Sequence, residues 1–125
     1  MKKIILILAT FVSSFAFSGA PTCHTHSSGP YCQYTGQVEK VYVNTGGHIL
    51  LYFDVLMDSS VPSNVGLNVS NYFAAIYPLN DFPEFGNLLY STMLAAQATG
   101  RNVTVQMRKT LHGYLEIDRI WLDSP

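Results

Sequence analysis

Two cysteines and two histidines lie close together near the start of the chain, as Cys23, His24, His26 and Cys32. Thiolate and imidazole groups bind zinc, so one interpretation is a metal site that the loop at residues 27–30 folds into place. The other is a disulfide between the two cysteines, which are the only ones in the chain. The spacing of these four residues matches no standard zinc motif. The first residues of the chain also resemble an export signal, as described below, and an exported protein enters an oxidising compartment. We therefore expect the disulfide, with no metal and no cofactor.

Three residues that could contact a ligand follow this loop: Tyr31, Tyr34 and Thr35. Aromatic rings stack on the apolar faces of sugars, and their hydroxyls, like that of threonine, form hydrogen bonds. The chain has eight tyrosines and one tryptophan, Trp121, and we expect most of these rings in the core or in a subunit interface. Tyr31 and Tyr34 are the expected exceptions. The predicted ligand-binding residues are therefore Tyr31, Tyr34 and Thr35.

The chain contains none of the common catalytic motifs. It has no Gly-x-Ser-x-Gly elbow, no HExxH helix and no phosphate-binding glycine loop. Its scattered carboxylates, such as Asp54, Asp58, Glu116 and Asp118, are explained by solvation at strand ends. Only five basic residues follow residue 18, against eight acidic ones, so a basic groove for nucleic acid is missing. We expect neither an enzyme nor a nucleic-acid-binding protein.

The first residues resemble a secretory signal. A short basic start precedes residues 4–17, which are nearly all apolar and too few to cross a bilayer. Small residues at Ala16 and Ser18 predict cleavage after Ser18. The alternatives are cleavage after Ala20 and an uncleaved membrane anchor. We expect a secreted or periplasmic protein.

Removal of residues 1–18 leaves 107 residues with a net charge near -3. A chain of this length can bury enough surface for one domain. No second apolar run of membrane length occurs, so no membrane span is expected in the mature chain. We divide the chain into a signal peptide at 1–18, an N-terminal segment with the disulfide loop at 19–35, and a folded domain at 36–125.

Hydrophobic alternation predicts five strands in the folded domain. The first shows a phase slip between Val38 and Val41, which predicts a bulge, and a hairpin turn at residues 44–47 joins it to the second. The second strand is apolar on both faces and is expected at the centre of the sheet. The last strand has a second phase slip near Asp118. The predicted strands cover residues 36–43, 48–55, 71–77, 102–108 and 114–122.

One helix is predicted between the third and fourth strands, after a surface loop at 58–70. Asp81 and Glu84 form a capping box at its start, and Gly100 ends it. One apolar stripe follows helical spacing and consists of Phe85, Leu88, Leu89, Thr92, Ala95 and Ala96. The order strand-strand-strand-helix-strand-strand matches a mainly β, five-stranded OB-fold-like barrel with one α-helix. A generic α+β sandwich has the same element order.

Two segments carry a family resemblance. Residues 88–105 (LLYSTMLAAQATGRNVTV) and residues 34–38 (YTGQV) resemble B subunits of bacterial pentameric toxins, in particular those of subtilase cytotoxin and typhoid toxin. Related small exported bacterial proteins of unknown role are also similar. The toxin subunits are secreted OB-fold proteins that form rings of five and bind cell-surface glycans. The resemblance therefore implies a homo-oligomer, a glycan receptor and an enzymatic A subunit as partners.

The resemblance also suggests roles for single residues. The glycan pocket of that family takes a Ser at the entry to the first strand and a Tyr late in the fourth, where this chain has Thr35 and Met107. Thr35 keeps a hydroxyl, whereas Met107 has none. In the toxins the helices line the central pore. Packing of this kind would partly bury the helix face formed by Tyr90, Met93, Leu94 and Gln97.

These observations give one leading hypothesis and two alternatives. The leading hypothesis is a secreted, non-enzymatic, toxin-B-subunit-like protein that oligomerises and binds a cell-surface glycan or a partner protein. The first alternative is a monomeric periplasmic OB-fold module that binds a small ligand or an envelope protein. The second is a structural or inhibitory partner of another exported protein.

Overall fold

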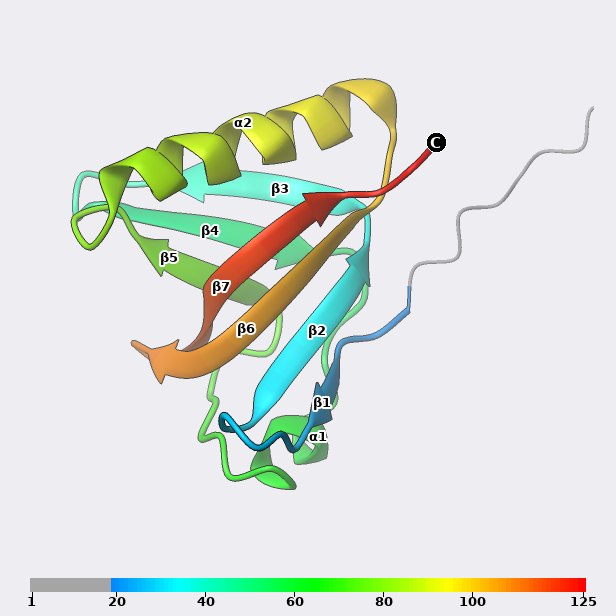
Figure 1. The fold of residues 1–125 in the computed structure, drawn as a ribbon, viewed down its shortest axis with the longest axis vertical. Helices are drawn as coiled ribbons and strands as arrows, with labels where there is room; N and C mark the ends of the chain where they lie inside the picture. The colour runs from blue at the N-terminus through cyan, green and yellow to red at the C-terminus, as the bar shows by residue number, and fades with distance from the viewer. Residues whose placement is uncertain (1–18) are drawn as a thin grey trace, which may run out of the picture.

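The computed structural model of the protein describes residues 19–125, and the predicted signal peptide at 1–18 lies outside the described residues. Within 19–125 the chain forms a seven-stranded sheet, one long helix and one short helix (Figure 1). The elements are β1 (Thr22–His24), β2 (Tyr31–Gly36), β3 (Val38–Val43), β4 (His48–Phe53), α1 (Ser60–Ser63), β5 (Ala74–Pro78), α2 (Pro83–Thr99), β6 (Val103–Leu111) and β7 (Tyr114–Leu122). The prediction of a mainly β chain with a long helix before the last two strands is confirmed.

The strands pair in the order β1-β2-β6-β7-β5-β4-β3. All neighbours are antiparallel except β5 and β7, which are parallel. β2 and β3 are consecutive in the chain, with Gln37 between them, yet β2 pairs with β6 and β3 pairs with β4. Within the described residues, β1 and β3 each pair with a single neighbour, so the sheet has two free edges and is not closed.

Several sequence predictions about the strands hold in detail. The bulge in the first predicted strand is a register shift between Val38 and Lys40. β4 lies between β3 and β5, as its two apolar faces indicate. The phase slip near Asp118 is also confirmed, because Gln106 pairs with Arg119 while the next residue, Met107, pairs with Ile117.

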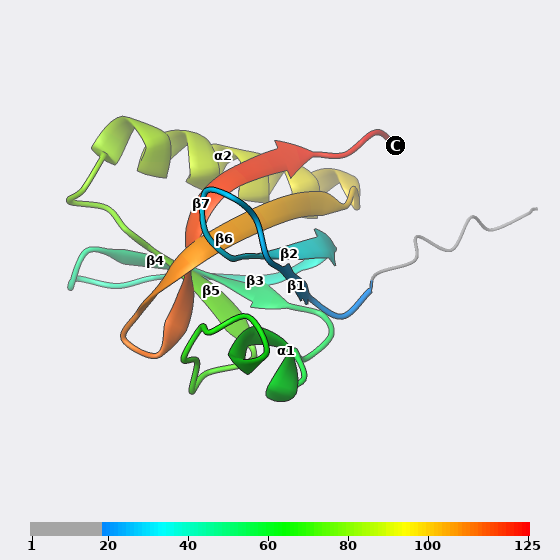
Figure 2. The ribbon, with the colours of Figure 1, turned by 60° about the horizontal axis from the view of Figure 1, so that its bottom comes forward.

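Other boundaries differ from the prediction. The hairpin of β1 and β2 was not predicted as strand, and α1 lies in the segment predicted as loop. The third predicted strand begins later, at Ala74, and runs through Pro78. Figures 1 and 2 show α1 and α2 on opposite sides of the strands.

The predicted capping box of α2 is wrong. Phe82 occupies the N-cap position and its side chain makes no capping hydrogen bond. Asp81 belongs instead to a turn, in which its backbone N–H donates to the carbonyl of Pro78. The helix starts well without the box, because Pro83 in the first turn presets the backbone and has no N–H to satisfy. The end at Gly100 is as predicted, with a left-handed φ of 65°.

The buried face of α2 also differs from the predicted stripe. The helix buries Gly86, Leu89, Met93 and Ala96 against the sheet, while Leu88 is 67% exposed. Met93 is fully buried, so the interpretation that places it in a subunit interface is wrong for this residue. The helix is apolar on more than one side. The side that is buried carries Gly86, where an added Cβ would lie 2.6 Å from the side chain of Leu79.

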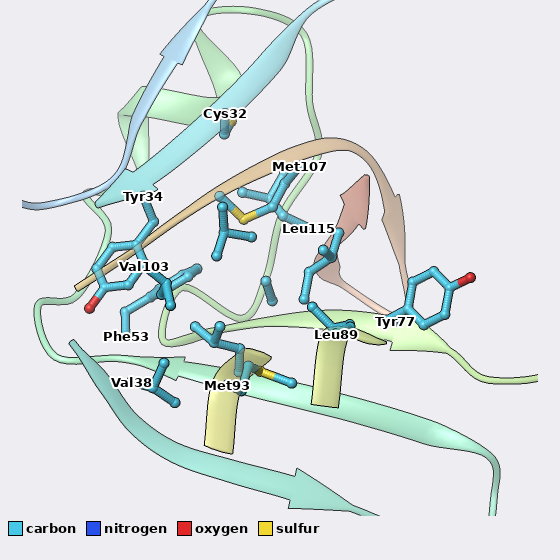
Figure 3. Packing of buried hydrophobic residues seen from close by; sticks show 14 of the residues in the cluster. Cys32, Tyr34, Val38, Phe53, Tyr77, Leu89, Met93, Val103, Met107 and Leu115 are labelled. Carbon is cyan, nitrogen blue, oxygen red and sulfur yellow. The ribbon is translucent and has the colours of Figure 1, made fainter. Parts of the chain in front are cut away.

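The core lies between α2 and the inner face of the sheet. Figure 3 shows Met93 and Leu89 of the helix pointing toward Val103, Met107 and Leu115 of β6 and β7. The inward set predicted for the fourth strand is confirmed, since Val103, Val105 and Met107 are all fully buried. No helix among residues 19–125 is both long and apolar enough to cross a membrane.

Candidate functional site

The disulfide predicted from the cysteine count is present between Cys23 and Cys32. The two residues face each other across β1 and β2, so the bond fixes the short β1 strand on the edge of the sheet. Both sulfur atoms are used, which removes the thiolates that the zinc interpretation needed. Within residues 19–125, no cluster of three or more His, Cys, Asp or Glu side chains is placed to hold a metal ion.

Tyr34 lies in the core, and its predicted role in ligand binding is wrong. Its side chain is fully buried and packs on Phe53, with 4.7 Å between ring centroids. The hydroxyl lies 2.5 Å from the Gln37 carbonyl and 2.6 Å from Asp54 Oδ1, and it accepts the Asp54 N–H at 3.1 Å. Burial and then the hydrogen bond to Asp54 raise the pKa of Tyr34 well above its ordinary value of 10.0.

The alternation of β2 explains this placement. Cys32, Tyr34 and Gly36 are buried, so Tyr31, Gln33 and Thr35 must point to the other face of the sheet. Tyr31 and Thr35 therefore lie on one side of the strand but near its two ends. Tyr31 lies beside His24, at 5.3 Å between rings, and below the guanidinium of Arg108 at 5.6 Å.

The outward side chains of β2, β6 and β7, together with Asp123, form a surface that we call the polar face. The strand register places Thr35 opposite Thr104, and Thr104 opposite Trp121. The next row pairs Gln33 with Gln106. A hollow of about 440 Å³ lies over this part of the polar face. It is lined by Gln33, Thr104, Gln106, Trp121, Leu122, Asp123 and Ser124.

Hydrogen bonds fix the polar groups around the hollow. The Thr35 and Thr104 hydroxyls are 3.0 Å apart, and Thr104 lies 3.1 Å from both carboxylate oxygens of Asp123. The side-chain amide of Gln106 donates to Gln33 Oε1 at 3.0 Å. Arg101 fixes the backbone at Asp123, because its Nε donates to the Asp123 carbonyl at 2.7 Å. The hollow therefore has preoriented hydroxyl, amide and carboxylate groups.

Trp121 adds a large aromatic surface to this polar set. Its side chain is 44% exposed even though it lies in a regular strand. A half-exposed indole ring beside fixed amide and carboxylate groups can stack on the apolar face of a sugar ring while its neighbours bond the hydroxyls. Thr35, a predicted site residue, does not line the hollow itself but contacts Thr104, which does.

The sequence prediction missed most of the residues that line the hollow. The sequence pattern predicts no role for Gln33 and does not distinguish Trp121 from the other aromatic residues. One available signal is the β6–β7 hairpin: the turn at His112 and Gly113 fixes its register, and the predicted outward face of β6 then places Trp121 beside Thr104 and Gln106. The partner strand β2 gives no such signal, because it lies about 70 residues earlier in the chain.

Searches against protein-family models, curated proteins and solved structures found no match for this chain. The site is therefore interpreted from its own geometry.

Proposed function

We propose that this protein is an exported, non-enzymatic sugar-binding protein and that the hollow beside Trp121 is its site. The observation that carries the proposal is the combination of one half-exposed indole with fixed Gln, Thr and Asp side chains in a single open hollow. Open polar hollows with an aromatic wall suit a sugar better than a flat apolar ligand, which needs an enclosed apolar pocket. The signal-like residues 1–18 support the export part of the proposal, and the disulfide is compatible with it.

The strand pairing supports the OB-fold-like part of the proposal. β2 and β3 are joined by one residue and pair with opposite halves of the sheet, as the two arms of one bent first strand would. In this description β4, β5, β6 and β7 are the second to fifth strands, and α2 follows the third. The β1 strand is then an addition that the disulfide holds in place. This arrangement is the one expected for a toxin-B-subunit-like chain.

Assembly into a homo-oligomer, a pentamer by resemblance, is the second part of the proposal. Val43, at the free edge strand β3, is 50% exposed and lines a hollow together with Tyr90 of α2. Leu94, one turn further along α2, is 42% exposed. A free strand edge next to exposed apolar side chains is a surface that proteins usually cover. Gln97 on this side instead bonds the Val38 carbonyl of its own chain.

The sugar site is tested with a glycan array followed by titration of the selected glycan. Because Trp121 is the only tryptophan, its fluorescence reports directly on the hollow. We expect Trp121→Ala to abolish binding and Gln106→Ala to weaken it about fivefold, since a hydrogen bond between neutral groups contributes about 1 kcal/mol.

Tyr42→Ala is the matched control for the tryptophan variant. Tyr42 is also 44% exposed, but it lies on β3, away from the polar face. Its removal should leave glycan binding unchanged. Equal loss of binding in the Tyr42 and Trp121 variants, or full binding by Trp121→Ala, would reject the hollow as the site.

The alternative function is a monomeric periplasmic module that uses the same polar face for a small ligand or an envelope protein. Cell fractionation separates the two proposals, because retention in the periplasm favours the module and release favours the toxin-like subunit. Purification of a tagged chain from its own cells tests whether an enzymatic A subunit accompanies it.

A further inference from the structure

A second cavity, of about 300 Å³, lies where β5 and β7 separate and shares no lining residue with the hollow beside Trp121. These two strands pair only at Ala75–Leu115 and Ile76–Glu116 within the described residues, and the first turn of α2 covers the gap beyond. We call this cavity the Glu116 pocket. It is lined by Tyr77, Asp81, Phe82, Phe85, Arg108, Lys109, Glu116, Ile117 and Asp118.

Glu116 is the one buried charged residue among residues 19–125, with 9% of its surface exposed. No group within this part of the chain donates a hydrogen bond to its carboxylate. Its closest cation is the Lys109 ammonium, 3.8 Å away, on a side chain that is 74% exposed. The Glu116 side chain keeps 11% of its surface exposed, and neither carboxylate oxygen is an enclosed atom without a partner, so the oxygens open into the pocket. An ion pair with an exposed lysine contributes little to stability. The carboxylate is therefore available to a donor that enters the pocket.

The other charges at the pocket are already matched or lie at the surface. Asp118 lies 3.5 Å from Arg108 and 2.8 Å from Arg119, so two guanidinium groups neutralise it. Asp81 is exposed at the rim. The pKa of Tyr77 is raised by burial first and then by the charges of Asp81 and Glu116, which agrees with an excess of negative charge at this wall.

Aromatic rings form the other wall of the pocket. Tyr77 and Phe85 meet edge to face, with 4.9 Å between centroids, and the Tyr77 hydroxyl donates to the Phe82 carbonyl at 3.1 Å. This bond holds Phe82, which is 58% exposed, at the entrance. Aromatic faces attract cations, and a nearby carboxylate adds to that attraction.

We propose that the Glu116 pocket binds a primary ammonium group on a short hydrocarbon stem, which displaces Lys109, donates to Glu116 and packs its stem on Phe82 and Phe85. Such a group is found both in small alkylamines and in the lysine side chain of another protein. The site is separate from the sugar hollow and does not depend on it.

The test titrates the full mature chain at pH 7 with n-butylammonium, n-butanol and a lysine blocked at both backbone ends, followed by amide NMR shifts. We expect both amines to shift the signals of residues around the pocket and butanol to have no effect. Tighter binding of the blocked lysine indicates a protein ligand, and tighter binding of butylammonium indicates a small amine.

Two variants should act in opposite directions. Glu116→Gln should weaken amine binding at least about tenfold, because it removes a charge-assisted hydrogen bond. Lys109→Ala should strengthen it about two- to fivefold at low salt, because it removes the resident cation. Glu39→Gln, an exposed carboxylate on β3, is the matched control and should change nothing.

Unfolding midpoints show whether each variant keeps the fold. If Glu116→Gln fails to fold, Lys109→Ala still decides the matter. Unchanged or weaker amine binding in Lys109→Ala, binding that persists in a folded Glu116→Gln, or equal shifts with butanol would each overturn the proposal. Sugar binding at Trp121 should be the same in all three variants, so a failure here leaves the sugar proposal untouched.

Discussion

Tyr34 joins three parts of the chain through one hydroxyl: the end of β2, the residue Gln37 that leads into β3, and Asp54 just after β4. The bend between β2 and β3 thus depends on a buried side chain. Tyr34 also shows that the alternation of side chains along β2 decides which residues can contact a ligand. A shift of one position along β2 separates a core tyrosine from Thr35 on the polar face.

Replacing Tyr34 with Phe should lower the free energy of unfolding by about 1–3 kcal/mol, since the Asp54 N–H and the Gln37 carbonyl lose a buried partner while the ring stays in place. Urea unfolding followed by circular dichroism measures the change. Tyr42→Phe, at an exposed tyrosine, should cost less than about 0.5 kcal/mol. An equally small effect at Tyr34 would show that the bend does not need this hydroxyl.

The raised pKa of Tyr34 also predicts a loss of stability in alkali. The native protein retains a proton that the unfolded chain releases near pH 10, so unfolding becomes more favourable as the pH rises past that value. Burial raises the pKa of Tyr114 in the same direction. Urea midpoints should be flat from pH 7 to 9 and fall above about pH 10. The fall should be shallower in Tyr34→Phe, and an identical slope would argue against the assignment.

The residues at the site could be predicted only in part. The sequence indicated the disulfide, because the chain has only two cysteines and a signal-like start, and it indicated the outward position of Thr104 and Gln106, because the alternation along residues 102–108 is local. It did not indicate that Tyr34 points inward, since the polar and aromatic residues 31–35 show no simple hydrophobic alternation. Pairing with β6, about 70 residues later in the chain, decides which face of β2 is buried.

Among the elements, the β1–β2 hairpin depends most on a covalent bond. β1 has three residues, a free outer edge and exposed ends, so pairing alone holds it weakly. A bond that closes a loop of nine residues contributes about 2–3 kcal/mol in the chain-entropy model.

We therefore expect reductant to lower the free energy of unfolding by about 2–3 kcal/mol, measured as the shift of the urea midpoint with and without dithiothreitol. A variant with Cys23→Ser and Cys32→Ala should start at the lower value and no longer respond to reductant. A midpoint that does not move in the wild-type chain would show that the hairpin stands without the bond.

Helix α2 illustrates the limit of prediction at this scale. Its bounds follow from Pro83 and Gly100, which act through local backbone geometry. Its buried face does not follow, because Leu88, Leu89, Tyr90, Met93 and Leu94 place apolar groups around most of the helix. More than one face of the helix is therefore apolar, and packing against the sheet determines which face is buried.

For the whole molecule, the order of β3, β4, β5, α2, β6 and β7 was predictable because these strands and the long helix have periodic patterns, whereas β1, β2 and α1 have none that was recognised. From the free edge of β3 and the exposed apolar side chains beside it, we infer that the protein self-associates. Sedimentation velocity across micromolar concentrations should show an oligomer. Val43→Lys should dissociate it, because charge at an edge strand opposes pairing. Thr45→Lys, in the nearby exposed turn, is the matched control. A monomer at all concentrations would remove the oligomer from the proposal and favour the periplasmic module.

If the chain is exported, as we propose, the pairing of β2 with β6 also constrains the order in which it folds. The cysteines of the first hairpin would then enter the oxidising compartment early and could form their bond, whereas Thr35 could pair with Thr104 only after a further 69 residues. Until the C-terminal hairpin of β6 and β7 follows, β2 lacks its main neighbour, and α2 can pack on β3 and β4 but not on β7. An exported chain would therefore have to cross the membrane almost completely before the domain could fold, and a chain that ends before β6 would be oxidised but unfolded.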